Sequence, residues 1–141
     1  MVSLRQYQIL NACADSPELF YFLFAQVNYG GQVFPRGNGP GYAQYDDERE
    51  WTVTASASEI AGDVLKLAAR GLLDCWALWP RHRIDATPDD LLVYDDYRCL
   101  TFEDHVAQFG YGPHEFEATD AGIEEIHDAS NAGNAVGLGW A

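Results

Sequence analysis

The chain has 141 residues, of which 22 are acidic and 8 basic, and its net charge at neutral pH is -14. This length suits a single domain, and an aromatic content of 13% supplies a core, so disorder throughout the chain is excluded. The longest apolar run, Leu19 to Ala25, is far shorter than the roughly 20 residues of a membrane-spanning helix, and no export signal opens the chain. We therefore expect a cytoplasmic protein with no membrane partner.

The N-terminal third predicts two helices and a long loop. Apolar residues recur at helical spacing over 4–14 and predict the first helix. Ser16, Pro17 and an acid in the first turn are typical of a helix start, so a second helix is expected over 17–28. Glycines and prolines then punctuate residues 29–50, which predicts a loop.

A third helix is marked at both ends by capping signals. Trp51–Thr54 is a short β-type run, and Ser56 follows as the cap of a capping box that Glu59 completes. Gly71 is expected to end the helix in the left-handed conformation. Together these signals predict a helix over residues 58–70.

The C-terminal half predicts a short sheet and two further helices. The expected elements are, in order, a strand over 75–79, a segment over 91–94 that pairs with it across a loop, a short helix over 101–109, a strand over 114–118 and a helix that Thr119 caps. Residues 131–141, rich in Gly, Ala and Asn, form a tail, so residues 1–130 make up the single domain. The cysteines match no disulfide or metal spacing and are expected to be buried, reduced thiols: Cys13, Cys75 and Cys99.

Two short motifs carry a resemblance to a known fold family. The third helix runs into Leu67-Ala68-Ala69-Arg70-Gly71-Leu72-Leu73, and a later strand enters Phe116-Glu117-Ala118-Thr119-Asp120-Ala121-Gly122. In this order they resemble the winged helix-turn-helix superfamily, in which a recognition helix ends in a Leu-x-x-x-Gly-Leu-Leu type stop and the last strand of the wing leads into a Leu-Thr-x-x-Gly type helix cap. The resemblance implies an α+β fold, with a winged-helix-like core of about four helices, a small antiparallel sheet and two long inserted loops.

The same resemblance implies a DNA-binding surface, which is the alternative function. The helix over 58–70 would enter the major groove, and the wing would contact phosphates. Because this helix also carries Glu59 and Asp63, its charges cancel, and the small number of basic wing residues gives a shallow dependence of binding on salt. Such a regulator would act as a dimer. The residues concerned are Ser58, Lys66 and Arg70 on the helix and Arg81, His82 and Arg83 in the wing.

The charge of the C-terminal half favours a different partner. Between Ile84 and Asp128 there are thirteen acids, and the only lysine or arginine is Arg98. Such a field repels nucleic acid and attracts basic proteins, although acids can also serve only to keep a protein soluble. Two segments pair aromatic residues with adjacent acids, as interfaces do, although such rings can also fill a core. These predicted partner contacts are Tyr42, Tyr45, Asp46 and Asp47, and Tyr94, Asp95, Asp96 and Tyr97.

No motif in the sequence indicates catalysis, a metal or a cofactor. The glycine-rich stretch over 37–41 lacks the Lys-Ser/Thr of a phosphate-binding loop, and the Glu124-x-x-His127 spacing of a di-metal helix occurs once. We therefore expect a non-catalytic protein-binding module whose acidic face engages a basic partner, with an inhibitor or immunity-type protein as its most concrete form. A winged-helix transcriptional regulator is the alternative, and a small-molecule sensor or enzyme built on the aromatic core is the third interpretation.

Overall fold

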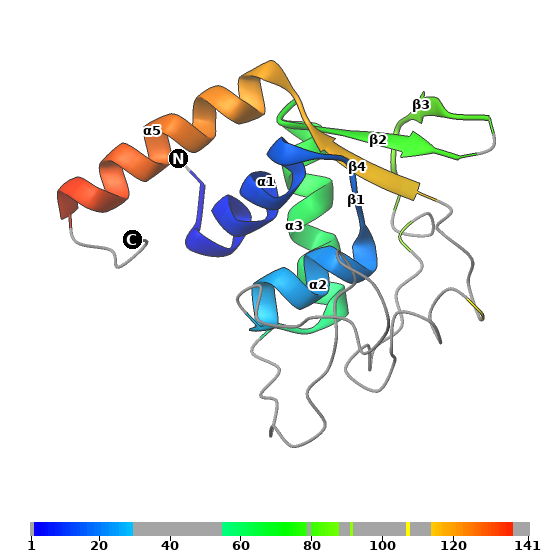
Figure 1. Cartoon of the computed structure of the whole chain (residues 1–141), viewed down its shortest axis with the longest axis horizontal. Coiled ribbons are helices and arrows are strands. Elements are labelled where there is room, and N and C mark those ends of the chain that lie inside the picture. The colour runs from blue at the N-terminus through cyan, green and yellow to red at the C-terminus, as the bar shows by residue number, and fades with distance from the viewer. Residues whose placement is uncertain are drawn as a thin grey trace.

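A computed structural model shows how the two ends of the chain fold together. The residues it describes are 2–29, 55–78, 80–87, 91, 107 and 114–136. Within these residues the chain forms four helices and a four-stranded antiparallel sheet (Figure 1), which confirms the mixed α+β class expected from the sequence. No helix in these ranges is both long and apolar enough to cross a bilayer.

The last strand of the described residues lies inside the sheet. The elements in chain order are α1 (Leu4–Asp15), β1 (Glu18–Leu19), α2 (Phe20–Tyr29), α3 (Ala57–Ala69), β2 (Leu73–Ala77), β3 (His82–Ile84), β4 (His114–Ala118) and α5 (Asp120–Val136). The strand order is β1-β4-β2-β3, and every neighbouring pair is antiparallel. β4 therefore lies between β1 and the β2–β3 hairpin (Figure 1).

Alternation along the strands divides the sheet into an inner and an outer face. Cys75 on β2 lies opposite Phe116 on β4 and Ile84 on β3, and this face is turned toward the helices. The residues next to Cys75, Asp74 and Trp76, belong to the outer face. α1 and α3 pack against the sheet, and α5 leaves the end of β4 and runs along α1 (Figure 1).

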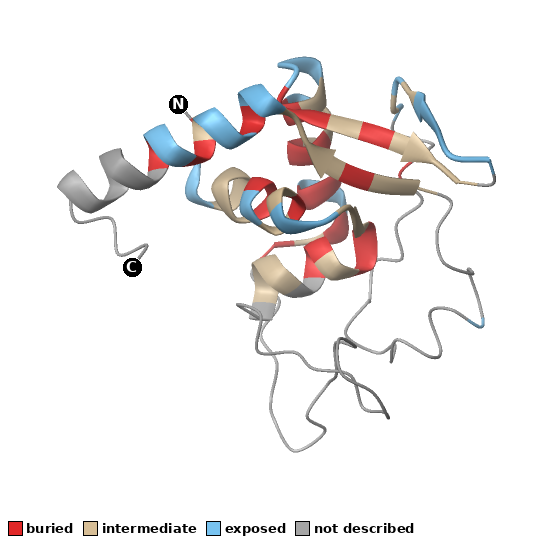
Figure 2. Ribbon diagram, turned by 45° about the horizontal axis from the view of Figure 1, so that its top comes forward, coloured by how far each residue is buried: buried red, intermediate tan, exposed pale blue. Residues whose placement is uncertain are grey.

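The core lies where α1, α2 and α3 meet the inner face of the sheet. Figure 2 shows buried segments on the inward sides of these helices and in the middle of the sheet. α2 contributes Phe20, Tyr21, Leu23 and Phe24 to this core, as its nearly continuous apolar sequence favours. Cys13 and Cys75 are buried and form no disulfide, as predicted. The largest fully buried side chains are Ile9, Leu10, Cys13, Tyr21, Leu23, Phe24, Ile60, Val64, Leu67 and Phe116.

Both predicted ends of α3 are confirmed. Ser56 Oγ accepts a hydrogen bond from the Glu59 amide at 3.1 Å, and Glu59 Oε1 accepts one from the Ser56 amide at 3.2 Å. At the other end Gly71 has a φ of 73°, and the amides of Gly71 and Leu72 donate to carbonyls in the last turn of the helix. This left-handed stop turns the chain directly into β2.

The two motifs behind the winged-helix resemblance meet in space. Thr119 Oγ1 donates to the Gly71 carbonyl at 2.6 Å, and the Thr119 amide donates to the Leu72 carbonyl at 3.1 Å. The same hydroxyl accepts a hydrogen bond from the Gly122 amide at 3.0 Å and so caps α5. A Cβ on Gly122 would lie 2.2 Å from the Leu72 carbonyl oxygen, so a residue with no Cβ is required there. The end of α3 is therefore joined to the start of α5.

The second helix begins later than predicted. Glu18–Leu19 forms strand β1 beside β4, and α2 starts at Phe20 instead of Pro17. Because Pro17 disfavours helical backbone at the residue before it, Ser16 is extended and ends α1. The predicted start was wrong because the backbone after Pro17 pairs with a strand that is remote in the sequence.

The strand beside β2 also differs from the predicted one. β3 occupies that position, with Trp76 opposite Arg83, whereas the sequence placed Arg83 in a loop and the pairing segment at 91–94. Because two of its three residues are polar, this strand has no hydrophobic pattern from which it could be predicted. At the C-terminus, α5 continues to Val136 and includes residues that we assigned to the tail.

The Asn28 side chain holds α2 against the start of α3. Its oxygen accepts a hydrogen bond from the Ala55 amide at 2.9 Å, and its nitrogen donates to the carbonyls of Ala55 at 3.0 Å and Phe24 at 3.1 Å. These hydrogen bonds join the end of α2 to the residue before the α3 cap, although residues 30–54 separate the two in the sequence. Of the sequence predictions, the loop after residue 29, the run Trp51–Thr54, Cys99 and most of the helix over 101–109 lie outside the described residues.

Candidate functional site

The residues predicted to contact DNA lie at separate places on the surface. Ser58 is exposed in the first turn of α3, whereas Lys66 and Arg70 are exposed near its C-terminal end. At 1.5 Å per residue, Ser58 and Arg70 are roughly 18 Å apart along the helix. The predicted wing residues are exposed around β3 and are Arg81, His82 and Arg83.

Arg81 lies on the outer face of the sheet, over Trp76. Its guanidinium carbon is 4.0 Å from the centroid of the Trp76 ring, which is a cation–π contact. Its nitrogens are 3.7 Å from Glu115 Oε1 and 3.8 Å from Glu117 Oε1 on β4. A phosphate that bound Arg81 would have to compete with both carboxylates.

The other basic residues of this surface have partners of their own. Arg83 Nη1 is 3.7 Å from Asp74 Oδ1 on β2, and Arg70 Nη2 is 3.9 Å from Glu125 Oε1 on α5. His82 Nδ1 lies 2.7 Å from a backbone carbonyl oxygen in the turn before β3. These contacts direct the side chains toward three different parts of the fold. The structure therefore does not bring the predicted DNA contacts together on one face.

A fourth arginine is held between α1 and α3. Arg5 forms an ion pair with Asp63, the buried charged residue of the described core, and Gln6 Nε2 donates to the other oxygen of that carboxylate at 3.2 Å. Arg5 Nη1 is also 3.2 Å from Glu59 Oε2. The hydrogen bond to Asp63 raises the pKa of Arg5. Removing Arg5 would leave the buried Asp63 carboxylate without a counter-charge, so this cluster stabilises the contact between the two helices.

The ion pairs weaken the attraction of the predicted DNA-binding surface for nucleic acid. Among the lysines and arginines in the described ranges, Lys66 alone has no ion pair. Exposed pairs contribute about 0–1 kcal/mol each, so a ligand can displace them. They nevertheless cancel the positive field that nucleic-acid binding depends on.

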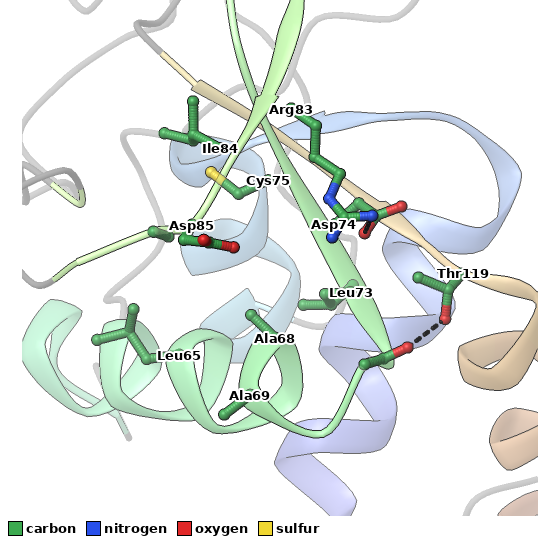
Figure 3. A pocket seen from close by; sticks show the side chains of 12 residues that line it. Leu65, Ala68, Ala69, Leu73, Asp74, Cys75, Arg83, Ile84, Asp85 and Thr119 are labelled. Atoms are coloured by element: carbon green, nitrogen blue, oxygen red, sulfur yellow. Dashed lines mark hydrogen bonds and ion pairs between the residues drawn. The ribbon is translucent and has the colours of Figure 1, made fainter.

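A groove opens between α3 and the β2–β3 hairpin and encloses about 540 Å³ (Figure 3). Gly71 and Thr119 line the end of this groove at which the two motifs meet. We call it the α3–β3 groove. Its apolar floor comes from α3, from the inner side of the hairpin and from the residues after β3, and consists of Leu65, Ala68, Ala69, Leu73, Cys75, Ile84 and Ala86.

The rim of the α3–β3 groove is charged. Asp74 and Arg83 line its edge along the hairpin, where they form an ion pair on the outer face of the sheet, and Figure 3 shows the two side chains close together. Asp85, directly after β3, has its side chain between the hairpin and α3 (Figure 3). Asp85 is exposed and, within the described part of the chain, has neither an ion pair nor a hydrogen bond. The rim therefore carries one uncompensated negative charge above an apolar floor.

More negative charge follows the exposed side of α5. Asp120, Glu124 and Asp128 recur every four residues, so they lie on one face of this helix. All three are exposed, and none has an ion pair with another described residue. We call these three residues the α5 acidic stripe.

The shifted pKa values belong to the caps and the core. Burial raises the pKa of Glu18 in β1 and that of the Cys13 thiol in α1. The hydrogen bond from the Ser56 amide lowers the pKa of Glu59, and the bonds from Arg5 and Ser56 act in the same direction. These shifts follow from a capping box, an ion pair and buried positions, and they assign no acid–base role.

The sequence did not indicate the α3–β3 groove. In the sequence, Leu65 and Ala69 fit the general pattern of a helix, and Asp85 is one of many acids. These residues come together only because the hairpin packs on α3. The alternation of Asp74 and Trp76 with buried neighbours was the available signal for an outer sheet face. The residues predicted to contact a partner lie outside the described part of the chain and remain predictions: Tyr42, Tyr45, Asp46, Asp47, Tyr94, Asp95, Asp96 and Tyr97.

Comparison of the chain with protein-family models, with curated proteins and with solved structures finds no match in any of the three. The function is therefore argued from the residues and their geometry.

Proposed function

We propose that the chain is a non-catalytic protein-binding module of winged-helix-like architecture that engages a basic partner protein. The observation that carries this proposal is the charge of the surface with which such a fold would read DNA. Its arginines are already paired with carboxylates of the same chain. The charge that stays uncompensated in the described part is mostly negative, on Asp85 and the α5 acidic stripe. This field attracts a positively charged protein.

The order of the elements supports the winged-helix part of the proposal. α3 ends in the stop motif and passes into β2, and β4 leads into the capped start of α5, in the order that the resemblance implies. The hydrogen bonds from Thr119 to the carbonyls of Gly71 and Leu72 give a physical reason why the two motifs occur together. They hold the proposed recognition helix against the helix that follows the wing.

The connection between α2 and α3 favours a protein partner over DNA. A DNA-binding helix-turn-helix joins its helices by a turn of roughly three to four residues, whereas residues 30–56 lie between α2 and α3. The N-terminal end of a recognition helix contacts base edges, and in this chain the long connection returns there, at Ala55 and Ser56. The same connection contains the predicted contacts Tyr42 and Tyr45.

An inhibitor or immunity-type protein is the most concrete form of this function. The lysines and arginines of a nucleic-acid-binding surface pair with phosphates, and carboxylates can take the place of those phosphates. An acidic module that covered such a surface would block it without catalysis.

A DNA-binding transcriptional regulator is the second candidate, because the same element order favours it. In that case Lys66, Arg70, Arg81 and Arg83 would bind phosphates after exchanging their carboxylate partners. Few such contacts would give weak binding with a shallow dependence on salt.

A capture experiment with matched variants separates the two candidates. Tagged wild-type chain is incubated with lysate of the source organism at about 0.05 and 0.5 M salt, with and without nuclease. One variant neutralises the acidic surface (Asp120→Asn, Glu124→Gln, Asp128→Asn), and another neutralises the basic one (Lys66→Gln, Arg83→Gln). We expect one basic protein to be retained at low salt, to survive nuclease and to be lost with the acidic-surface variant only. Retention of DNA that nuclease abolishes and that the basic-surface variant loses would contradict the proposal.

A further inference from the structure

We infer that the α3–β3 groove is the contact point for the basic partner and that it takes a lysine or arginine side chain of that protein. The inference rests on the proposed function and names the chemistry of its site. It follows from three properties of the groove, namely its apolar floor, its charged rim and its position.

The floor suits the hydrocarbon part of a long basic side chain. Lysine and arginine bury their methylene groups along apolar surface while the charged end stays at the edge. Leu65, Ala69 and Ile84 supply such a surface, and the small alanine side chains of α3 leave room above the helix (Figure 3). An aromatic or branched side chain would gain burial there as well, so the floor alone does not decide the occupant.

The charge of the rim favours a positively charged occupant of the groove. Asp85 is exposed at the mouth of the groove and lacks a partner within the described residues, whereas Asp74 and Arg83 pair with each other, at 3.7 Å, on the outer face of the sheet. A positively charged group at the end of a side chain that lay on the apolar floor would be paired by Asp85. An incoming carboxylate or phosphate would instead meet Asp85 as a like charge, which disfavours an acidic ligand.

The position of the groove fits a partner that normally binds nucleic acid. The groove is formed by α3 and the hairpin, the two elements that a winged-helix fold directs at DNA. A basic side chain that reached this surface would meet carboxylates on a scaffold shaped for contact with a phosphate backbone.

Binding of a fluorescein-labelled deca-lysine peptide to the full chain tests the inference. Fluorescence anisotropy gives the dissociation constant at about 0.05 M salt, and amide chemical-shift changes locate the contact. Asp85→Asn removes the rim charge, and Ala69→Trp fills the groove from an exposed position. Asp15→Asn and Ala121→Trp are the matched controls, because they make the same substitutions at exposed positions outside the groove and outside the residues of the α5 acidic stripe.

We expect Asp85→Asn to weaken peptide binding about three- to fivefold, in line with the loss of one exposed charge pair, and Ala69→Trp to weaken it about tenfold. The two control variants should stay within about twofold of the wild type, and the largest shift changes should fall on α3 and β3. Equal binding by all five proteins would overturn the inference but leave the proposed function standing, because the acidic surface would then attract the peptide without a specific groove. No binding by the wild type would overturn both.

Discussion

Substitution of Gly122 by alanine tests how tightly α5 is joined to the end of α3. An added Cβ would lie 2.2 Å from the Leu72 carbonyl oxygen, which is backbone and has no rotamer to change. The two segments must therefore move apart, at an overpacking cost of about 1–3 kcal/mol. The movement also weakens the hydrogen bonds that Thr119 donates to the carbonyls of Gly71 and Leu72, each worth about 0.5–1.5 kcal/mol.

Alanine favours a helix over glycine by about 1 kcal/mol, which offsets part of this cost. We expect Gly122→Ala to lower the free energy of unfolding by about 3 kcal/mol. At an m-value of about 2 kcal/mol/M, the midpoint of urea unfolding then falls by about 1.5 M. Far-UV circular dichroism during urea titration measures both quantities.

Gly62→Ala is the matched control, because an added Cβ there has no heavy atom within 4 Å and the residue lies inside α3. It should raise the free energy of unfolding by about 0.5–1 kcal/mol. If Gly122→Ala were neutral or stabilising like Gly62→Ala, the close approach of α5 to Leu72 would be refuted. The close approach of Leu72 would then also not explain why the second motif has a glycine at position 122.

Three further outcomes follow from single side chains. Asn28→Ala should lower the free energy of unfolding by about 2–3 kcal/mol in urea titrations, because the buried amide and carbonyl of Ala55 lose their partner; an unchanged midpoint would show that water replaces it. Burial raises the pKa of Glu18, so the charged carboxylate is disfavoured in the folded chain. The stability that the protonated group contributes is fully present below its unfolded pKa, and it is lost as the pH rises through the folded pKa. Glu18→Gln should therefore raise the free energy of unfolding at pH 7 by roughly 0.5 kcal/mol or less, since the group is partly exposed. Below a pH of about 4 it should have no effect. Urea midpoints measured across this pH range test both expectations. Burial also raises the pKa of Cys13, so its thiol should resist iodoacetamide at pH of about 8 in the folded chain and react once urea is added; rapid labelling of the native chain, read by mass spectrometry, would contradict this.

The features predicted best from the sequence are those that depend on neighbouring residues. The capping box of Ser56 and Glu59 and the left-handed Gly71 involve contacts within one turn of helix, so the local pattern specifies them. The strand at 114–118 and the cap at Thr119 were equally local. Each could be predicted without knowing what packs against it.

The features predicted worst depend on partners that are remote in the sequence. Glu18–Leu19 has the composition of a helix start and becomes a strand because β4 offers its edge. Arg81 belongs to a basic cluster in the sequence and is neutralised in space by Glu115 and Glu117, since the turn before β3 places it over Trp76, on the face of the sheet that carries these two acids. A charge count along the chain therefore misjudges the surface, because which charges face each other is decided by strand register.

The corner between α2 and α3 shows how two packed helices can be joined by so long a connection. The entropy of closing a loop grows only with the logarithm of its length, so a connection about six times longer than a four-residue turn costs roughly 1.6 kcal/mol more. The two hydrogen bonds between Asn28 and Ala55 contribute about 0.5–1.5 kcal/mol each and can offset that cost. Because Asn28 and Ala55 flank residues 30–54, the helix pair is held from both ends of the connection. The contact of α2 with the start of α3 is thus supported by two hydrogen bonds of one side chain.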